Sequence, residues 1–125
     1  MSLSKLQEGK KGEDLAVSFI KNLGYKIIDR NFRLRNGEID IVAIEKSGKA
    51  QPTLVFVEVK TRSSDEFGDP LEAITWWKMR TLVRAAQVYK ISHRGLPELM
   101  RIDAISVQLS DMGDPEIEHI KNISG

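Results

Sequence analysis

The sequence has no cysteine, which excludes a disulfide scaffold, a cysteine-ligated zinc or iron–sulfur site and a thiol nucleophile. No apolar run approaches the ~18–20 residues of a membrane span, and the first residues lack the apolar stretch of a signal peptide. An excess of one charge is also missing, since 19 Lys and Arg face 18 Asp and Glu, and this balance excludes a strongly basic, histone-like nucleic-acid binder. We therefore expect a cytoplasmic protein that has no membrane partner.

What the sequence does contain fits one globular domain. Its 125 residues are 41% hydrophobic and 30% charged, as in ordinary soluble proteins. We expect a flexible N-terminal tail over residues 1–7 and a single domain over residues 8–125. Apolar residues at helical spacing predict a first helix over residues 8–23, and Gly24 is a natural C-terminal stop.

Most of the remaining patterns are typical of strands. A hairpin signal, Asn36-Gly37, lies between the first two of them, and the apolar run that follows Pro52 is the most strand-like segment of the chain. The expected strands lie within residues 25–35 and over residues 38–44, 54–62, 100–109 and 116–123.

A second helix is expected between the third and fourth strands. Its start has the pattern of a capping box, with Asp69 as the N-cap, Pro70 at the first helical position and Glu72 at the third. We expect this helix to continue to about Ser92. An α/β fold, in which a sheet of about five strands is flanked by helices, is the simplest way to bury the apolar stripes of both helices.

Charged residues interrupt two of the expected strands. Asp40 has apolar neighbours on both faces of its strand, so its carboxylate needs a partner inside the protein. The two-residue period of a strand places Glu58 and Lys60 on one face, about 6.6 Å apart along the strand. We identify these three residues as the main candidates for a functional site.

The pairing of these two strands determines how the candidates meet. The favoured antiparallel register places Asp40 opposite Glu58 and Ile44 opposite Leu54, since a slip of one residue would turn a carboxylate to the wrong face; a register displaced by two stays open. Two opposed carboxylates, with Cβ atoms about 5 Å apart, repel each other strongly. A positive group is therefore expected between them.

A divalent cation would provide that charge. Oxygen ligands, the absence of cysteine and the sequence distance to both histidines favour Mg²⁺, with Mn²⁺ as a substitute, over Zn²⁺. Lys60 would then orient or activate a water molecule, or neutralise charge on a phosphoryl group, so the expected chemistry is metal-assisted phosphodiester hydrolysis. The alternative is a buried ion-paired cluster without function, which is costly relative to apolar side chains.

Each expected helix adds one candidate. Glu13 lies at the edge of the apolar stripe of the first helix and is able to reach the sheet, although a Glu in a first turn also complements the helix dipole. Lys78 falls in the middle of the apolar stripe of the second helix. Because an unpaired lysine is expensive there, we expect Lys78 to point into the acidic site.

Two further pairs of residues have simpler expected roles. Trp76 and Trp77 project away from the apolar stripe of the second helix, which suits a dimer contact or a stacking surface for nucleic acid. We favour a third alternative, packing under the loop of residues 63–68. Arg101 and Asp103 share one face of a strand and are expected to form only a local ion pair, without a catalytic role.

Four segments together resemble the YraN-like uncharacterised protein family. In order between residues 8 and 109, they are GED, RNFRLRNGEIDIVA, VFVEVKTR and FGDPLEAI. The resemblance implies the PD-(D/E)XK restriction-endonuclease-like fold, a three-layer α/β/α arrangement around a mixed sheet. In that superfamily an acidic residue on the first helix, an Asp on the second core strand and an E-x-K on the third bind magnesium and cleave DNA. The corresponding residues here are Glu13, Asp40, Glu58 and Lys60.

The chain also differs from the superfamily pattern. Ile39 stands before Asp40 where the superfamily name has Pro, and Glu38 is a further candidate ligand. The plan is similar to that of archaeal Holliday-junction resolvases, which act as dimers, so a homodimer is a further expectation.

The leading hypothesis is a magnesium-dependent nuclease that acts on DNA, branched or damaged DNA included, with RNA as an open alternative. Lys78 would contact the scissile phosphate. A second hypothesis is a non-catalytic nucleic-acid-binding or assembly module that retains the nuclease fold. A third is a protein-interaction domain that uses the surface of Trp76 and Trp77.

The near-neutral net charge conceals an uneven distribution. Residues 1–35 carry eight basic and four acidic groups, and residues 76–101 carry six and one, whereas residues 36–75 carry four and eight. The two basic segments are expected to flank the acidic centre and hold phosphates. The candidate nucleic-acid-binding residues are Arg30, Arg33, Arg35, Arg62, Arg80 and Arg84.

Overall fold

Two α-helices and five strands make up the part of the chain that the computed structural model describes, residues 3–46, 48 and 50–125. In order, the elements are α1 (Lys5–Asn22), β1 (Lys26–Leu34), β2 (Gly37–Glu45), β3 (Thr53–Arg62), a short 3₁₀ helix η1 (Pro70–Ala73), α2 (Trp76–Ser92), β4 (Leu99–Gln108) and β5 (Glu116–Ile120). Neither described helix is long and apolar enough to cross a membrane.

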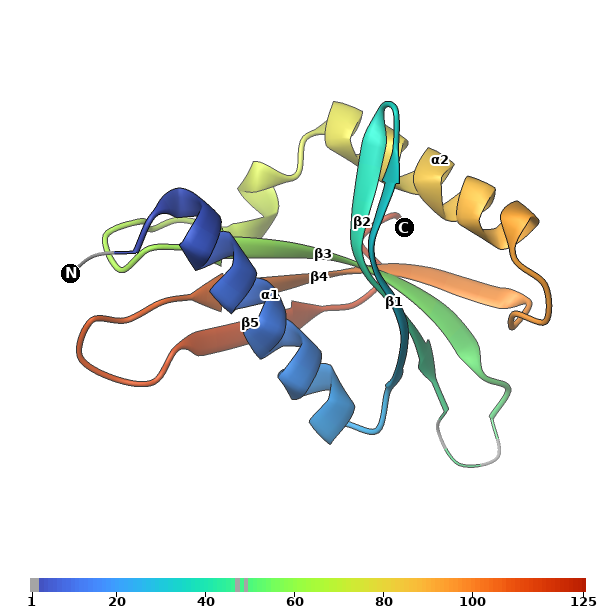
Figure 1. Ribbon diagram of the computed structural model, residues 1–125, viewed down its shortest axis with the longest axis horizontal. Helices are drawn as coiled ribbons and strands as arrows, with labels where there is room; N and C mark the ends of the chain where they lie inside the picture. The colour runs from blue at the N-terminus through green and yellow to red at the C-terminus, as the bar shows by residue number, and fades with distance from the viewer. Residues whose placement is uncertain (1–2, 47, 49) are drawn as a thin grey trace.

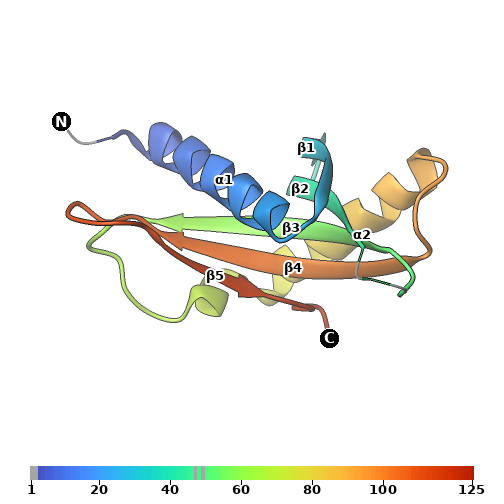
Figure 2. The same ribbon diagram turned by 90° about the horizontal axis from the view of Figure 1, so that it is seen from below.

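The strands form one mixed sheet in the order β1-β2-β3-β4-β5. β3 and β4 are parallel, and the other neighbours are antiparallel. Helix α1 crosses in front of β3 and β4, whereas α2 passes behind β2 (Figure 1). Seen along the edge of the sheet in Figure 2, α1 covers one face, which together with α2 on the other completes the expected three-layer α/β/α plan.

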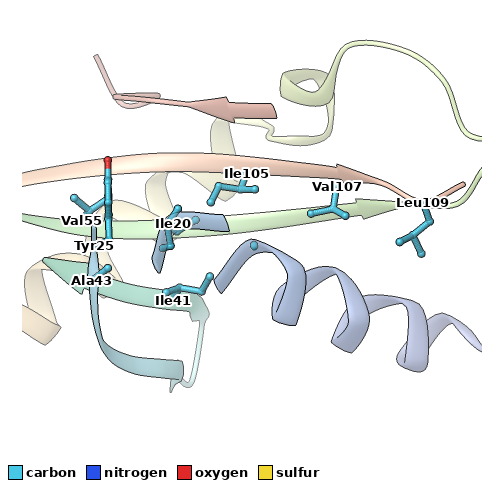
Figure 3. Packing of buried hydrophobic residues seen from close by; sticks show 10 residues of the cluster. Ile20, Tyr25, Ile41, Ala43, Val55, Ile105, Val107 and Leu109 are labelled. Carbon is cyan, nitrogen blue, oxygen red and sulfur yellow. The ribbon is translucent and has the colours of Figure 1, made fainter. Parts of the chain in front are cut away.

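The alternation of side chains along β2 and β3 creates two cores. Ile41 and Val55 face α1 and surround Ile20, as Figure 3 shows, whereas Val42 and Phe56 face α2. All of these side chains are at most 1% exposed. Since burying one such side chain contributes about 1.5–3 kcal/mol, the sheet is anchored from both faces near its centre.

Helix α1 begins earlier than its periodicity predicts. Residues 5–7, expected in a loose tail, form its first turn because Ser4 and Gln7 make a capping box. The Gln7 N–H donates to Ser4 Oγ at 3.1 Å, and the Ser4 N–H donates to Gln7 Oε1 at 2.9 Å. This pattern satisfies backbone donors that the start of a helix otherwise leaves unpaired.

Helix α2 begins later than expected. The Asp69 side chain accepts from the Leu71 N–H at 2.9 Å, but it caps only the short turn η1. Ile74 then adopts an extended conformation and packs against the core under α2. The helix starts at a second N-cap, where Thr75 Oγ1 accepts from the Lys78 N–H at 3.1 Å. The prediction of a helix from Pro70 was therefore wrong by about one and a half turns.

Candidate functional site

The site lies where β2 and β3 separate. The two strands pair from Glu45 with Thr53 to Ile41 with Val57, which confirms the predicted register. Beyond the last pair, β2 turns away with β1 while β3 continues beside β4 (Figure 1). Asp40 stands just past that point, and its Oδ2 accepts from the Val59 N–H at 2.7 Å. A side-chain carboxylate thus continues the contact between the strands where the backbone ladder ends.

A hollow of about 510 Å³ opens at this fork between α1 and the strands. Four of the five predicted catalytic residues line it together: Glu13, Asp40, Glu58 and Lys60. They come from three different elements, so the fold brings together what the sequence separates. From here on we call this hollow, with these four residues, the acidic hollow.

A glycine that the sequence reasoning did not single out allows α1 to reach the acidic hollow. A Cβ on Gly12 would lie 1.8 Å from Oγ1 of Thr61 on β3, so no larger residue fits without moving one of the two elements. This close approach brings the next residue, Glu13, against the sheet. The signal in the sequence was the glycine of the GED segment, whose packing role becomes visible only with β3 in place.

The two central carboxylates are not fully neutralised by the protein. Burial, followed by the negative charge of Glu58, raises the pKa of Asp40 to about 7. Burial also raises the pKa of Glu58, although Lys78 acts in the opposite direction. Ionising both groups near neutral pH is therefore unfavourable unless more positive charge arrives.

Lys78 supplies part of that charge. It lies in the first turn of α2, and its Nζ is 3.3 Å from Glu58 Oε1. The prediction that Lys78 points to the acidic residues is therefore confirmed. Its side chain is 41% exposed, so the ion pair is partly screened by water.

Glu13 lies at the acidic hollow but is held by β1. Its Oε1 accepts from Arg30 Nε at 2.9 Å and from Asn31 Nδ2 at 3.1 Å. The alternative of a first-turn Glu at the helix dipole was wrong, because α1 begins at Lys5 and Glu8 occupies that turn. Sequence reasoning also missed Asn31, whose φ of 56° is in the left-handed region that Asn tolerates better than most residues.

The donor set fits a hard cation only in part. Among residues 3–46, 48 and 50–125, no three carboxylate or imidazole groups lie close enough to hold a metal ion between them. Asp40 and Glu58 provide the oxygen ligands that Mg²⁺ and Mn²⁺ prefer, and water or phosphate oxygens would complete such a shell. Glu13 lines the same hollow, and its Oε1 is already paired with Arg30.

The sequence as a whole matches Uncharacterised protein family UPF0102 over residues 12–107. The chain belongs to this family. It is 48% identical to a UPF0102 protein of Geobacter metallireducens, over 98% of this chain and 95% of the relative. A UPF0102 protein of Alkaliphilus oremlandii is 47% identical over 91% and 94%, and one of Mycolicibacterium vanbaalenii is 39% identical over 97% and 96%. The YraN-like resemblance seen in four segments is thereby confirmed.

The UPF0102 fold does not gather the predicted arginines into one rim. Arg30 and Arg33 line the acidic hollow, where Arg30 also pairs with Glu13. Arg35 is exposed at the end of β1. Arg62 instead donates to the Gly68 carbonyl at 2.6 Å, on the loop that follows β3. The remaining two, Arg80 and Arg84, are exposed on α2 beside a separate hollow.

The tryptophans of this UPF0102 chain are not covered by a loop. Trp76 is 64% exposed and Trp77 is 69% exposed, so the expected packing under residues 63–68 was wrong. Because α2 begins at Trp76 instead of Pro70, both rings lie in its first turn, on the side away from the core.

A second group of charged residues lies outside the acidic hollow, around Asp103 on β4. Asp103 is fully buried and accepts from Arg101 Nε at 2.8 Å and from the Asn122 N–H at 2.9 Å, and it also contacts His119 Nε2 at 2.8 Å. Arg101 Nη1 donates to Glu45 at 2.7 Å. The expected local ion pair is therefore part of a larger network that joins β2, β4 and β5.

Proposed function

We propose that this chain is a metal-dependent nuclease that hydrolyses phosphodiester bonds in DNA, branched or damaged DNA included. The observation that carries the proposal is the pair of partly buried carboxylates, Asp40 and Glu58, both with raised pKa, in a hollow that Lys60 also lines. The PD-(D/E)XK fold that the YraN-like resemblance implies supports the proposal, because these residues stand in the segments that carry the resemblance.

The energetics of the pair favour a bound cation. Two neighbouring carboxylates that the protein leaves partly uncompensated lower the stability of the fold when both are ionised. A chain under selection for stability alone would lose little by replacing one with an apolar or amide side chain. Such a pair is useful when an external cation binds to it, since perturbed carboxylates of this kind gather at functional sites.

Each residue of the acidic hollow has a distinct task in the proposed reaction. Asp40 and Glu58 would hold Mg²⁺ or Mn²⁺, which when bound polarises a phosphoryl oxygen and lowers the pKa of water. Lys60 would stabilise negative charge at the phosphate or orient the attacking water. Lys78, next to Glu58, would contact the scissile phosphate, and Glu13 would support the water.

The test compares two lysines that line the same hollow. Branched, nicked and single-stranded DNA are incubated with Mg²⁺ and the wild type, Lys60→Ala or Lys10→Ala, and the products are counted on gels. Lys10 also lines the hollow, but its side chain is 78% exposed. We expect Lys60→Ala to lose about 10²–10³-fold in rate, as removal of a charge-stabilising donor does elsewhere, and Lys10→Ala to retain nearly full activity. Equal rates for the wild type and Lys60→Ala would contradict the assignment.

One observation favours the second candidate function, a non-catalytic nucleic-acid-binding or assembly module. Glu13 Oε1 is paired with Arg30, and no three carboxylate or imidazole groups of the described chain lie close enough to hold one metal ion. Calorimetric titration with Mg²⁺ and with Mn²⁺ separates the two candidates. Heat that disappears in Asp40→Asn supports the nuclease, whereas no binding at millimolar metal, with or without DNA, supports the module.

A further inference from the structure

The exposed tryptophans belong to a surface that the acidic hollow does not use. A hollow of about 440 Å³ lies at the start of α2, and we call its four main residues, Trp76, Trp77, Arg80 and Arg84, the tryptophan surface. Asn36, from the turn between β1 and β2, closes one side of it. No carboxylate lies among the described residues that line this hollow.

The two indole rings and the Arg80 side chain pack against one another. The rings meet edge to face, with centroids 5.0 Å apart and an interplanar angle of 71°. The Arg80 guanidinium lies 4.9 Å from the centroid of Trp76 and 5.9 Å from that of Trp77. Arg80 therefore lies nearer to Trp76, and Trp77, at 69% exposure against 64% for Trp76, is the slightly more exposed ring.

The charge of α2 indicates the chemistry of that ligand. The helix carries Lys78, Arg80, Arg84 and Lys90 and has no acidic residue along its length. A polyanion complements this charge, and indole faces between cations are the combination that binds unpaired bases and their phosphates. A duplex is a poorer occupant, because the faces of its bases are already stacked on each other and are not accessible to an indole.

The tryptophan surface also lies next to the acidic hollow. Trp77 is followed directly by Lys78, whose Nζ contacts Glu58 at 3.3 Å. The hairpin of β1 and β2 touches both places, since Arg33 lines the acidic hollow and Asn36 lines the tryptophan surface. A DNA strand that binds to the indoles would thus extend along the hairpin of β1 and β2 toward the carboxylates.

We propose that the tryptophan surface stacks unpaired nucleotides of a DNA strand, so that the substrate has a single-stranded segment beside the bond that is cleaved. The part about cleavage rests on the proposed function, whereas the binding of the strand does not. This assignment selects branched, flapped or gapped DNA over intact duplex.

The two tryptophans are the only ones in the sequence, so intrinsic fluorescence reports on this surface alone. With EDTA present, the protein is titrated with an oligothymidine strand and with a blunt duplex of equal length. We expect the single strand to quench the fluorescence and the duplex to leave it nearly unchanged. The quenching should weaken as salt rises, because phosphate contacts release counterions. Quenching by the duplex as strong as that by the single strand would overturn the proposal.

Variants then assign the quenching to stacking. Binding of a dye-labelled strand is measured by anisotropy for Trp77→Ala, Trp77→Phe and Ile91→Ala. Ile91 is the matched control, because it is on the same helix, apolar and 85% exposed. We expect Trp77→Ala to weaken binding roughly 10- to 100-fold, the usual effect of one lost stacking contact, while Trp77→Phe and Ile91→Ala bind almost as the wild type does. Unchanged binding by Trp77→Ala would overturn the proposal.

The two proposals fail separately. Strand binding that persists in EDTA, without cleavage under any metal condition, upholds the stacking surface and contradicts the nuclease. Cleavage of flapped DNA at equal rates by the wild type and Trp77→Ala upholds the nuclease and contradicts the stacking surface. A dimer that Trp77→Ala dissociates in sedimentation experiments, with no quenching by the strand, would assign the surface to protein contact and overturn the proposal.

Discussion

Two parts of the sheet hold carboxylates in opposite electrostatic states, partly buried in the acidic hollow and fully buried at Asp103. In the acidic hollow, burial and the neighbouring Glu58 raise the pKa of Asp40 to about 7. In the network on β4, burial again opposes ionisation, but hydrogen bonds from His119 and Arg101 lower the pKa of Asp103 to about 2. The chain therefore neutralises one buried carboxylate with its own groups and leaves the other short of positive charge.

The difference separates a structural role from a functional one. The network joins β2 to β4 through Arg101, which contacts both Glu45 and Asp103, and β4 to β5 through Asp103 and His119, so its charges are paired in the absence of any ligand. The acidic hollow has the half-exposed Lys78 as the cation in contact with Glu58. It gains stability only when a cation is added, and this is the property expected of a binding site.

The largest loss of stability is expected when the carboxylate of the network is removed. We expect Asp103→Ala to lower the free energy of unfolding by about 3–5 kcal/mol, because the largely buried Arg101 guanidinium loses one of its two carboxylate partners and the Asn122 N–H loses its acceptor. Urea denaturation at pH 7 measures the loss. Asp114→Ala, at an exposed position, is the control and should stay within about 0.5 kcal/mol of the wild type. Equal losses in both variants would show that the network does not carry the stability assigned to it.

The corresponding change in the acidic hollow should have the opposite sign. A carboxyl whose pKa is raised by folding favours the folded state below its ordinary pKa, near pH 4, and loses that contribution as pH rises through about 7. We expect Asp40→Asn to raise the free energy of unfolding at pH 8 by on the order of 2 kcal/mol in EDTA, since the amide cannot ionise and its oxygen still accepts from Val59.

Denaturation at pH 5 and at pH 8 tests this sign. The gain should shrink at pH 5, where Asp40 in the wild type is mostly protonated. Asp114→Asn removes the same charge from an exposed position and should show no comparable pH dependence. A loss of stability in Asp40→Asn at pH 8 would refute the view that this carboxylate is short of positive charge.

Added metal should reduce the difference in charge compensation between the acidic hollow and the network around Asp103. A cation that binds the folded chain alone stabilises it by RT ln(1 + [L]/Kd), or roughly 1.4 kcal/mol at ten times Kd. We expect Mg²⁺ or Mn²⁺ to raise the Tm of the wild type at pH 8 relative to NaCl of equal ionic strength, and to leave Asp40→Asn unchanged. An equal rise in both proteins would place the metal elsewhere.

The smallest effect is expected at Lys78, the lysine of α2 that pairs with Glu58. The Lys78–Glu58 pair is partly exposed, so a double-mutant cycle with Lys78→Met and Glu58→Gln should give a coupling energy of about 0.2–1 kcal/mol. The cycle is measured by urea denaturation at pH 7. A coupling above about 3 kcal/mol would make this pair equivalent to the buried network and remove the contrast.

The centre of the site was predictable because it depends on short-range periodicity. The alternation along β2 and β3 predicted which residues face each core, and the same alternation selected the register that the structure confirms over Ile41–Glu45 and Thr53–Val57. The position of Asp40 across from Glu58 follows from that register. The family, too, was recognisable from four short segments, although the reaction and its metal stay predictions.

The surroundings of the site were not predictable in the same way. The partner of Glu13 is Arg30, from a different element, and the helix start at Thr75 depended on whether Ile74 found a place in the core. The sequence contains two credible N-caps, Asp69 and Thr75, and the local pattern does not choose between them. Packing in the tertiary structure decides between the two N-caps, and as a result both tryptophans are exposed.

The sequence by itself therefore determined the faces of the strands, the register and the pair of opposed carboxylates. Only the tertiary structure decided which buried charges are neutralised: it brought Arg101, Glu45 and His119 to Asp103, and left Asp40 and Glu58 with one half-exposed lysine. The physical reason is the separation along the sequence over which each effect acts. Side-chain alternation is dictated by neighbouring residues, whereas burial and the supply of opposite charge depend on which distant segments pack together.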